Sequence, residues 1–292
     1  MSAASAAVSA PWRAVLTRIR RNRAALVALA IIALFVLVAL LAPVVAPYPP
    51  DAQPDIVGLA RVGPSLAHPF GTDTFSRDVL SRVIFGSRIS LGVATLAVLL
   101  SITVGTSYGA IAGYAGGPID GLMMRVIDAL LAIPRVLLLI LALALWGRIA
   151  LPSLILVLGL TGWFGTSRLV RARVRTLAVQ DFALAARALG ARDGRVLWRH
   201  VLPNALSPVL VAATLGIGNV IVLEAGLSYF GLGVQPPHAS WGNIIQDGSD
   251  NIARGWWIAL FPGLAMLVTV LCFNIIGDAL RDALDPREER RS

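Results

Sequence analysis

Hydrophobic residues occur in six long runs along the 292-residue chain, and polar residues gather between these runs. A helix that crosses the hydrocarbon layer of a bilayer needs about 20 mostly apolar residues, so each run is long enough to span a membrane. The pattern therefore predicts an all-α, polytopic membrane protein with six transmembrane helices. The runs cover residues 24–46, 89–113, 126–147, 149–170, 206–231 and 256–280.

The first run follows four arginines and resembles a secretory signal only in that respect, because it stays apolar beyond the about 7 to 15 residues of a signal's core. It predicts a membrane helix that remains in the mature chain. Before it, Trp12, Val15, Leu16 and Ile19 recur at helical spacing, with arginines at other positions. Residues 1–23 are therefore expected to form a cytoplasmic amphipathic segment along the inner membrane surface.

Positive charge is distributed unevenly over the polar segments. Six spans leave 18 of the 25 arginines on the face that holds both termini and 6 on the opposite face, with Arg135 inside a span. Because cytoplasmic segments carry the excess of basic residues, both termini are predicted to be cytoplasmic. The formal charge of +9 then reflects topology, and a nucleic-acid-binding function is disfavoured because the arginines line membrane edges.

Three residue counts limit the chemistry of the chain. The single cysteine, Cys272, excludes a disulfide or a cysteine metal cluster within this chain. The three histidines, His68, His200 and His238, lie on both predicted faces and predict no metal site. The chain has no Lys, so it lacks the nucleotide-binding loop whose Lys contacts the phosphates of ATP. Any ATP chemistry must come from a partner.

The polar loop at residues 171–204 has the pattern of two short helices with a break. Strong helix formers fill residues 181–189, and Gly190 can supply the left-handed conformation that ends a helix. Asp193 is expected to cap a second helix that stops at Pro203. The first helix is smooth, since Ala occupies positions 183, 185, 186 and 188, and it suits close docking on another protein. A helical hairpin without a partner is the alternative.

Several segments carry a resemblance to a known family. The run Ala185-Ala186, three residues, Gly190 and then residues 202–204 (LPN) resembles the EAA signature of permease subunits of bacterial ABC importers. Residues 68–82, residues 227–242 and the carboxyl end from residue 261 resemble the dipeptide and oligopeptide class, in the subunit called the C permease. Leu184 departs from the signature, which usually has Glu or a similar polar residue there.

The resemblance implies a type I ABC importer permease fold with a five-helix core at residues 89–281. The helix at 24–46, an external loop at 47–88 and a cytoplasmic tail at 282–292 complete the chain. It also implies a transport subunit rather than an enzyme, in the bacterial cytoplasmic (inner) membrane. The implied partners are a second permease of the B type, two cytoplasmic ABC ATPases that use ATP and Mg, an extracytoplasmic substrate-binding protein and membrane lipid. This chain itself would bind no cofactor.

The resemblance places the coupling to the ATPases on the short helix before Gly190. The coupling residues are expected to be Ala185, Ala186, Arg187, Leu189, Gly190 and Pro203. Ionisable and polar residues inside spans are costly, so each either lines the translocation pathway or joins helices. The pathway candidates are Asn219, Glu224, Tyr229 and Asn274.

Two intramembrane charges have structural interpretations as well. Glu224 is expected more readily as a buried carboxylate bonded to Tyr229, Asn219 or a neighbouring helix than as a pathway residue. Arg135 lies seven residues after Asp128 on the same face of a helix, which favours an ion pair or snorkelling to the inner surface over substrate binding.

Dipeptides or oligopeptides are the expected substrates, with nickel chelates or glutathione as alternatives within the same architecture. A secondary transporter would also explain six spans and would act without an ATPase, but it leaves the patterned loop unexplained. A membrane-embedded enzyme is disfavoured, because no nucleophile with a base and no paired carboxylates fall inside a span.

Overall fold

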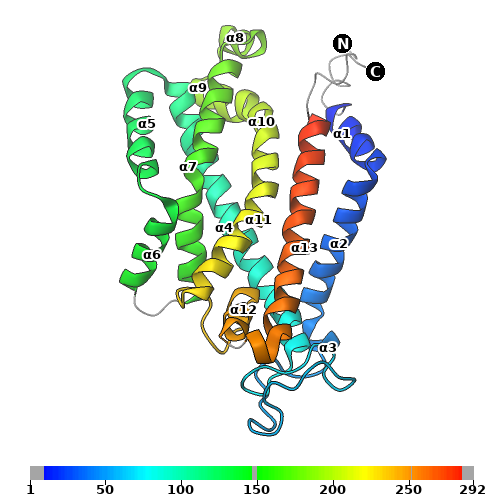
Figure 1. Ribbon diagram of the computed structural model, residues 1–292. Helices are drawn as coiled ribbons and strands as arrows, with labels where there is room; N and C mark the ends of the chain where they lie inside the picture. Colours follow the sequence, from blue (N-terminus) through cyan, green and yellow to red (C-terminus); the bar gives the residue numbers. More distant parts are fainter. Residues whose placement is uncertain (1–9, 147–149, 251, 285–292) are drawn as a thin grey trace. The chain divides into compact units, whose positions relative to one another are not determined.

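The computed structural model describes residues 10–146, 150–250 and 252–284 of the chain. Within these residues the chain is helical, apart from loops and one isolated β-bridge between Thr72 and Asp78. Five helices in this part are long and apolar enough to cross a membrane, and a bent pair supplies a sixth span if it counts as one. The predicted all-α membrane architecture is therefore confirmed (Figure 1). The five helices are α2 (Arg23–Leu40), α4 (Val79–Ala115), α7 (Leu151–Leu177), α11 (Ser207–Tyr229) and α13 (Ile252–Leu284).

The chain divides into two compact units that share α4 and α11. The first unit is Met1–Ala94 with Ile217–Ser292, and the second is Thr95–Gly216. Both units therefore receive part of α4 and part of α11, and each is described by itself below.

The first unit is built around α13. This helix packs against α12 (Trp241–Ser249), α2 and α1 (Ala10–Arg21), and Arg18 of α1 donates a hydrogen bond to the carbonyl of Ala283 at 3.1 Å. Helix α1 confirms the predicted helical character of residues 10–21, while residues 1–9 lie outside the described part. The first predicted span is interrupted after Leu40, and α3 (Ala42–Val45) follows. Pro43 explains the interruption, because it has no backbone N–H to continue the α2 ladder.

The second unit holds the remaining elements. Helices α5 (Gly117–Leu131), α6 (Arg135–Trp146) and α10 (Leu202–Ala205) all pack against α7. Between α7 and α10 lie α8 (Asp181–Ala188), α9 (Asp193–Arg195) and a π-helical turn at Val196–Val201. The polar loop at residues 171–204 is thus helical over most of its length, as its pattern predicts.

The second predicted span begins ten residues earlier than expected. Helix α4 starts at Val79 rather than at Ile89, so the external loop ends well before residue 88. The hydropathy pattern misses these ten residues of helix because they include Ser81, Arg82 and Ser87. All three are buried in the fold and hydrogen-bonded, so they need not face lipid. At the other end of the chain, α13 continues to Leu284, past the predicted limit at 281, and residues 285–292 lie outside the described part.

The third predicted span is not one straight helix. Helices α5 and α6 meet at an angle of 82° across residues 132–134, where Pro134 removes a backbone donor. The ends of the third and fourth runs at residues 147–149 lie outside the described part. This bend matters for chemistry, because residues on either side of it no longer share a helix face.

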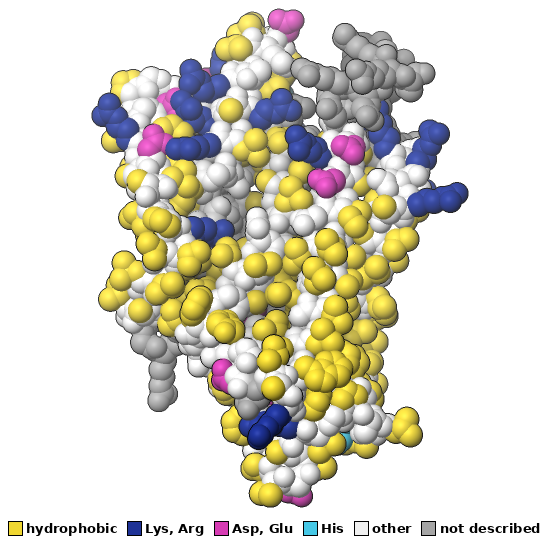
Figure 2. Space-filling view, viewed as in Figure 1, with side chains coloured by type: hydrophobic (Ala, Val, Ile, Leu, Met, Phe, Trp, Pro, Cys, Tyr) yellow, Lys and Arg dark blue, Asp and Glu magenta, His cyan; other side chains and the backbone are white. Residues whose placement is uncertain are grey.

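The surface agrees with residence in a bilayer. Hydrophobic side chains cover the flanks of the helices, whereas arginine and acidic side chains gather toward the helix ends (Figure 2). Many of these large apolar side chains are exposed, among them Val27, Leu37 and Leu40 of α2. Such a surface suits lipid or another membrane subunit rather than water.

Candidate functional site

The residues predicted to couple the chain to a partner lie on and beside α8. Ala185, Leu189 and Gly190 are exposed, with Leu189 88% accessible, and Ala186 is half-buried. Gly190 has φ of +83°, so it is the left-handed residue that ends the helix, as predicted. The helix therefore presents a small, apolar face.

This face borders a recess of about 440 Å³ in the second unit. We call its lining the coupling surface: Phe182, Ala185, Ala186, Leu189, Gly190, Ala191, Arg195 and His200. Four of the six predicted coupling residues are thus brought together. Phe182 could have been found from its spacing of four residues to Ala186, whereas Arg195 and His200 depend on the turns after Gly190 and left no signal in the sequence.

The other two predicted coupling residues lie apart from the recess. Pro203 is exposed within α10, and the expectation that it ends the second helix is wrong. The backbone passes through a π-helical turn first, and Pro203 then stands near the start of α10, where its missing N–H costs no helical hydrogen bond. Arg187 points elsewhere: its Nε donates to the hydroxyl of Tyr114 at 3.4 Å, and its guanidinium lies 5.3 Å from the centre of that ring.

Tyr114 joins the end of α4 to the loop that follows α8. Its hydroxyl donates to Asp193 at 2.7 Å, and Arg187 lies 3.8 Å from the same carboxylate. The expectation that Asp193 caps the following helix is therefore wrong, because Asp193 is already the first residue of α9 and makes no capping hydrogen bond. The Asp193 carboxylate instead accepts a hydrogen bond from Tyr114, at the end of α4.

A hydrophobic cluster fixes the coupling surface to the membrane helices of the second unit. Ala183, on the inner face of α8, is fully buried against side chains of α4, α7, α10, α11 and the π-helical turn. The buried members are Ala110, Val170, Val174, Ala183, Val196, Leu197, Val201, Leu202, Ala205 and Val209. Displacement of α8 would consequently be transmitted through close-packed side chains.

Charged residues join α5 to α7 in the same unit. Arg171 makes a bidentate contact with the buried carboxylate of Asp120, and Arg175 lies 3.5 Å from it. Asp128 pairs with Arg168. The predicted ion pair between Asp128 and Arg135 is therefore wrong, since the bend between α5 and α6 separates the two residues. Arg135 instead donates to the carbonyl of Leu158 at 3.0 Å and to Thr161 at 3.5 Å.

The four pathway candidates fall into two groups in the first unit. Asn219, Tyr229 and Asn274 are exposed in the isolated chain. Asn274 lies against α11, because its Oδ1 would be 3.8 Å from a side chain placed on Gly218. Glu224 differs, since it is fully buried and reaches no open surface in this structure.

Glu224 is bonded to serines on two helices. Its Oε1 accepts a hydrogen bond from Ser228 at 2.7 Å, and its Oε2 accepts one from Ser90 of α4 at 3.3 Å. The interpretation of a carboxylate bonded to a neighbouring helix is borne out through Ser90, whereas no hydrogen bond to Tyr229 or Asn219 is found. The sequence could not select these serines, because nothing in its spacing relates residue 90 to residue 224.

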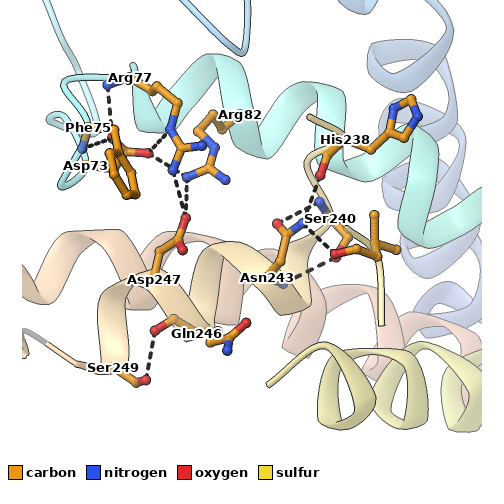
Figure 3. A network of polar contacts seen from close by, with 11 residues as sticks. Asp73, Phe75, Arg77, Arg82, His238, Ser240, Asn243, Gln246, Asp247 and Ser249 are labelled. Carbon is orange, nitrogen blue, oxygen red and sulfur yellow. Dashed lines mark hydrogen bonds and ion pairs between the residues drawn. The ribbon is translucent and has the colours of Figure 1, made fainter. Parts of the chain in front are cut away.

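Residues 230–240, which we call the α11–α12 segment, are held by polar contacts at several points. Ser240 and Asn243 form a reciprocal cap at the start of α12, and the Asn243 amide donates to the carbonyls of Val234 (3.2 Å) and His238 (2.8 Å). Figure 3 shows Asn243 between Ser240 and His238. The segment therefore has a defined conformation.

Helix α12 is also anchored by a buried ionic network. Asp247 contacts Arg77 at 2.9 Å and Arg82 at 2.8 Å, and both arginines contact Asp73, whose side chain is fully buried (Figure 3). Asp73 also accepts backbone hydrogen bonds from Phe75 and Arg77. Each buried charge thus has an opposite charge beside it, which is the condition under which such groups are tolerated.

Comparisons with known proteins agree with this architecture. The family described as "Binding-protein-dependent transport system inner membrane component" matches residues 105–290. The family described as "N-terminal TM domain of oligopeptide transport permease C" matches residues 10–75. The first of these covers more than half of the chain.

Curated relatives cover nearly the whole chain. The dipeptide transport system permease protein DppC of Alkalihalophilus pseudofirmus is 40% identical over 95% of this chain and 90% of its own length. The oligopeptide transport system permease protein OppC of Bacillus subtilis is 39% identical over 94% of this chain and 90% of its own. The glutathione transport system permease protein GsiD of Escherichia coli is 39% identical over 96% and 92%.

Solved structures of the MetNI methionine ABC transporter in inward-facing conformations share the fold. One of them superposes with a TM-score of 0.57 at 18% identity, covering 69% of this chain and 96% of that chain. At this identity the likeness concerns the fold alone, and it supports a type I ABC importer permease architecture.

Proposed function

The chain belongs to the DppC- and OppC-like permeases of the binding-protein-dependent ABC importers, and we propose that it carries dipeptides or oligopeptides into the cell. It forms one half of a translocation pathway, and a second permease of the B type forms the other. The names of the relatives support the substrate class, and the exposed apolar flanks of the helices support a membrane partner.

The observation that carries the coupling role is the exposed recess beside α8. Four apolar residues around it, Phe182, Ala185, Leu189 and Gly190, lie at the surface of a loop that is too polar to enter the membrane. An exposed apolar hollow of this kind is typical of a surface that another protein fills. We assign it to a cytoplasmic ABC ATPase.

The partner ATPases supply the energy in this proposal. The chain has no Lys, so the ATP and Mg chemistry belongs to the two ATPase subunits. When ATP closes the ATPase pair, α8 moves with it, and the cluster around Ala183 carries the movement to α4 and α7. The contact from Tyr114 to Asp193 and Arg187 provides a second route to the end of α4. Hydrolysis then returns the helices to their starting arrangement.

Orientation follows from the distribution of charge. With 18 arginines on the face of the termini and of α8, this face lies in the cytoplasm of a bacterial inner membrane. The α11–α12 segment then faces outward, where an extracytoplasmic binding protein delivers the substrate. Asn219, Tyr229 and Asn274 remain the proposed pathway residues, because they are polar and exposed on membrane helices.

A matched pair of leucines tests the coupling role, one within α8 and one directly after it. Leu189 lines the recess, whereas Leu184 is 47% exposed but lies outside its lining. We expect Leu189→Glu to reduce substrate uptake by at least about tenfold, because a charge must be desolvated against the ATPase, while ATP hydrolysis continues. Leu184→Glu, which restores the residue type usual in the EAA signature, should keep uptake within about twofold. Uptake and ATPase activity are measured in the complete transporter.

Equal uptake by the two variants would contradict the assignment of the coupling surface. Uptake without any ATPase subunit would contradict the importer as a whole and favour a secondary transporter.

The substrate class needs its own experiment. The similarity to GsiD makes glutathione the second candidate. Transport of a labelled dipeptide, a pentapeptide, glutathione and a nickel chelate is compared in cells that express the complete transporter with its binding protein. We expect the peptides to be preferred, and uptake of glutathione or nickel alone would replace the peptide assignment.

A further inference from the structure

Glu224 is the centre of a small hydrogen-bond network whose outer ends are backbone groups. The Ser228 hydroxyl donates to Oε1 and the Ser90 hydroxyl donates to Oε2. The same Ser228 oxygen accepts from the backbone N–H of Val234 at 3.2 Å, and the same Ser90 oxygen accepts from the backbone N–H of Trp241 at 3.1 Å. Ser228 thus connects the carboxylate to Val234 within the α11–α12 segment, and Ser90 connects it to Trp241, the residue directly after the segment.

The carboxylate determines how both hydroxyls are oriented. A serine hydroxyl has a single hydrogen, and donating it to Glu224 leaves the oxygen's lone pairs free for an incoming N–H. Hydrogen bonds to a charged acceptor are also stronger than neutral ones. Both contacts to the segment therefore depend on an acceptor at position 224.

The position of the network argues against a role limited to joining helices. Only one arm reaches another long helix, and that arm continues to Trp241 at the start of α12. Within the part of the chain that the structure describes, no arginine pairs with Glu224, and the polar groups beside its carboxylate are the hydroxyls of Ser228, Ser240 and Ser90. An acidic side chain at this depth is costly, which favours a function for it.

Two glycines let the segment pass close to this network, one by its lack of a side chain and the other by its backbone conformation. Gly233 lies so close to Ser228 that an added side chain would stand 2.0 Å from its hydroxyl and 2.5 Å from its backbone. Gly231 has φ of +74°, the left-handed conformation that glycine adopts readily. Phe230 before this turn is exposed and Leu232 after it is half-buried, whereas Val234 and Ala239 are buried.

We propose that Glu224 is a positioning residue for an outer gate formed by the α11–α12 segment. Its carboxylate holds the Ser90 and Ser228 hydroxyls so that they seat the segment in the resting state, and the two serine contacts are released when the helices rearrange during transport. This role rests on the proposed importer function. Glu224 then lies buried behind the side chains that line the pathway, and it acts through the two serines without contacting substrate.

The isosteric change Glu224→Gln tests the geometry. A Gln side chain accepts from one hydroxyl but presents an NH2 group to the other, so that serine can no longer donate to it. One of the two contacts to the segment is then weakened while the shape is unchanged. Ser228→Ala removes the contact to Val234 directly and leaves Glu224 in place.

Because the chain has a single native cysteine, its replacement leaves only an introduced thiol on this chain to react with a labelling reagent. In a Cys272→Ser background, Ala239→Cys places a thiol at a position that is 5% exposed, and His238→Cys places one at an exposed neighbour. Labelling by a polar maleimide is measured on the complete transporter in lipid nanodiscs, where both faces are accessible. We expect Glu224→Gln and Ser228→Ala to raise the labelling rate at position 239 by about 3- to 10-fold. This factor corresponds to the free energy of one net hydrogen bond that no longer holds the segment closed.

A third serine provides the matched control. Ser87 is buried one turn from Ser90, but its hydroxyl donates to the carbonyl of Ile84 at 2.6 Å within its own helix. Ser87→Ala should leave labelling at position 239 within about 1.5-fold. Labelling at position 238 should be fast and equal in every variant.

The response of labelling to nucleotide distinguishes a gate from a purely structural contact, because a purely structural contact would not change with the state of the ATPases. Trapping the ATPases with ATP and vanadate should raise labelling at position 239 in the parent, and this nucleotide response should fall toward none in Glu224→Gln, whose resting rate is already high. Unchanged labelling in both Glu224→Gln and Ser228→Ala would overturn the positioning role. A parent without nucleotide response, or a variant that retains the full response, would overturn the gate.

Two further controls keep the outcome decisive. If Glu224→Gln does not assemble, Ser228→Ala and Ser90→Ala are judged by the same labelling criteria. If the parent takes up no peptide but labelling follows the expected pattern, the peptide assignment fails and the role of Glu224 stands.

Discussion

The coupling surface, in the second unit, and the α11–α12 segment, in the first, differ in burial and in polarity. The α11–α12 segment is attached through buried polar groups, and Glu224, Ser90 and Ser228 all have partners within the chain. The coupling surface is exposed and apolar, with Leu189 88% accessible and a recess that no described side chain fills. The polar groups of the first region have partners within the chain, whereas the recess of the second region is open.

In each region the residue type alone would suggest a different role. A buried carboxylate in a membrane helix would suggest substrate contact, yet Glu224 is bonded to two serines that accept from the backbone of Val234 and Trp241. Exposed leucine and alanine would suggest lipid, yet Leu189 and Ala185 lie in an arginine-rich polar loop, and we propose that an ATPase covers them. In both regions the surroundings of a residue, rather than its type, indicate the role. Three changes test the contrast, in order of decreasing effect.

The largest loss is expected from the ionic network that anchors α12 beside the segment. Asp73→Ala removes the carboxylate that Arg77 and Arg82 share and leaves Arg82, 4% exposed, with Asp247 alone. Breaking a buried pair in this way costs about 3 to 5 kcal/mol. Thermal stability of the complete transporter in detergent measures it.

Asp55→Ala is the control for that change. Asp55 also accepts backbone hydrogen bonds, from Val57 and Gly58, but it is exposed. Its loss should cost less than about 1 kcal/mol. Equal losses from the two aspartates would mean that burial does not distinguish this region.

Two glycines separate a steric requirement from a conformational one. Gly233→Ala places a carbon against backbone atoms of Ser228, so we expect a loss of about 2 kcal/mol or more and a displaced segment. Gly190→Ala meets nothing within 4 Å, and only its φ of +83° opposes the change, at about 1 kcal/mol.

Asparagine then distinguishes the two positions, because it tolerates the left-handed conformation but still carries a side chain. Gly190→Asn should retain thermal stability close to the parent, whereas Gly233→Asn should be at least as damaging to stability as Gly233→Ala. Rescue at position 233 would show that its close contact with Ser228 relaxes at little cost.

The smallest effect is expected at the exposed contact between α4 and the coupling loop. Tyr114→Phe removes the hydrogen bonds to Asp193 and Arg187 but keeps the ring under the guanidinium. Contacts this exposed contribute less than about 1 kcal/mol, so uptake per ATP hydrolysed should fall by less than about twofold.

Tyr108→Phe on the same helix is its control, because Tyr108 donates to the carbonyl of Met123 and not to the coupling loop. It should leave uptake per ATP unchanged. A loss of coupling as large in Tyr108→Phe as in Tyr114→Phe would remove Tyr114 from the route between α8 and α4.

The sequence predicted the architecture and much of the coupling surface. Membrane helices depend on the length of apolar runs, and the turn at Gly190 depends on a local conformation, so both can be recognised from neighbouring residues. The same local reasoning misplaced the start of α4. It counted Arg82 as a polar loop residue, although Asp73 and Asp247 allow it to lie buried in a helix.

The partners of residues far apart in the chain depend on the tertiary structure. The bend at Pro134 separated Arg135 from Asp128, Tyr114 took the carboxylate of Asp193, and Ser90 reached Glu224 across 134 positions of sequence. Periodicity relates residues within one straight element, whereas the choice of partner depends on how separate elements pack. The sequence alone thus identified this chain as a membrane permease with a helical polar loop, and packing decided which of its polar residues contact one another.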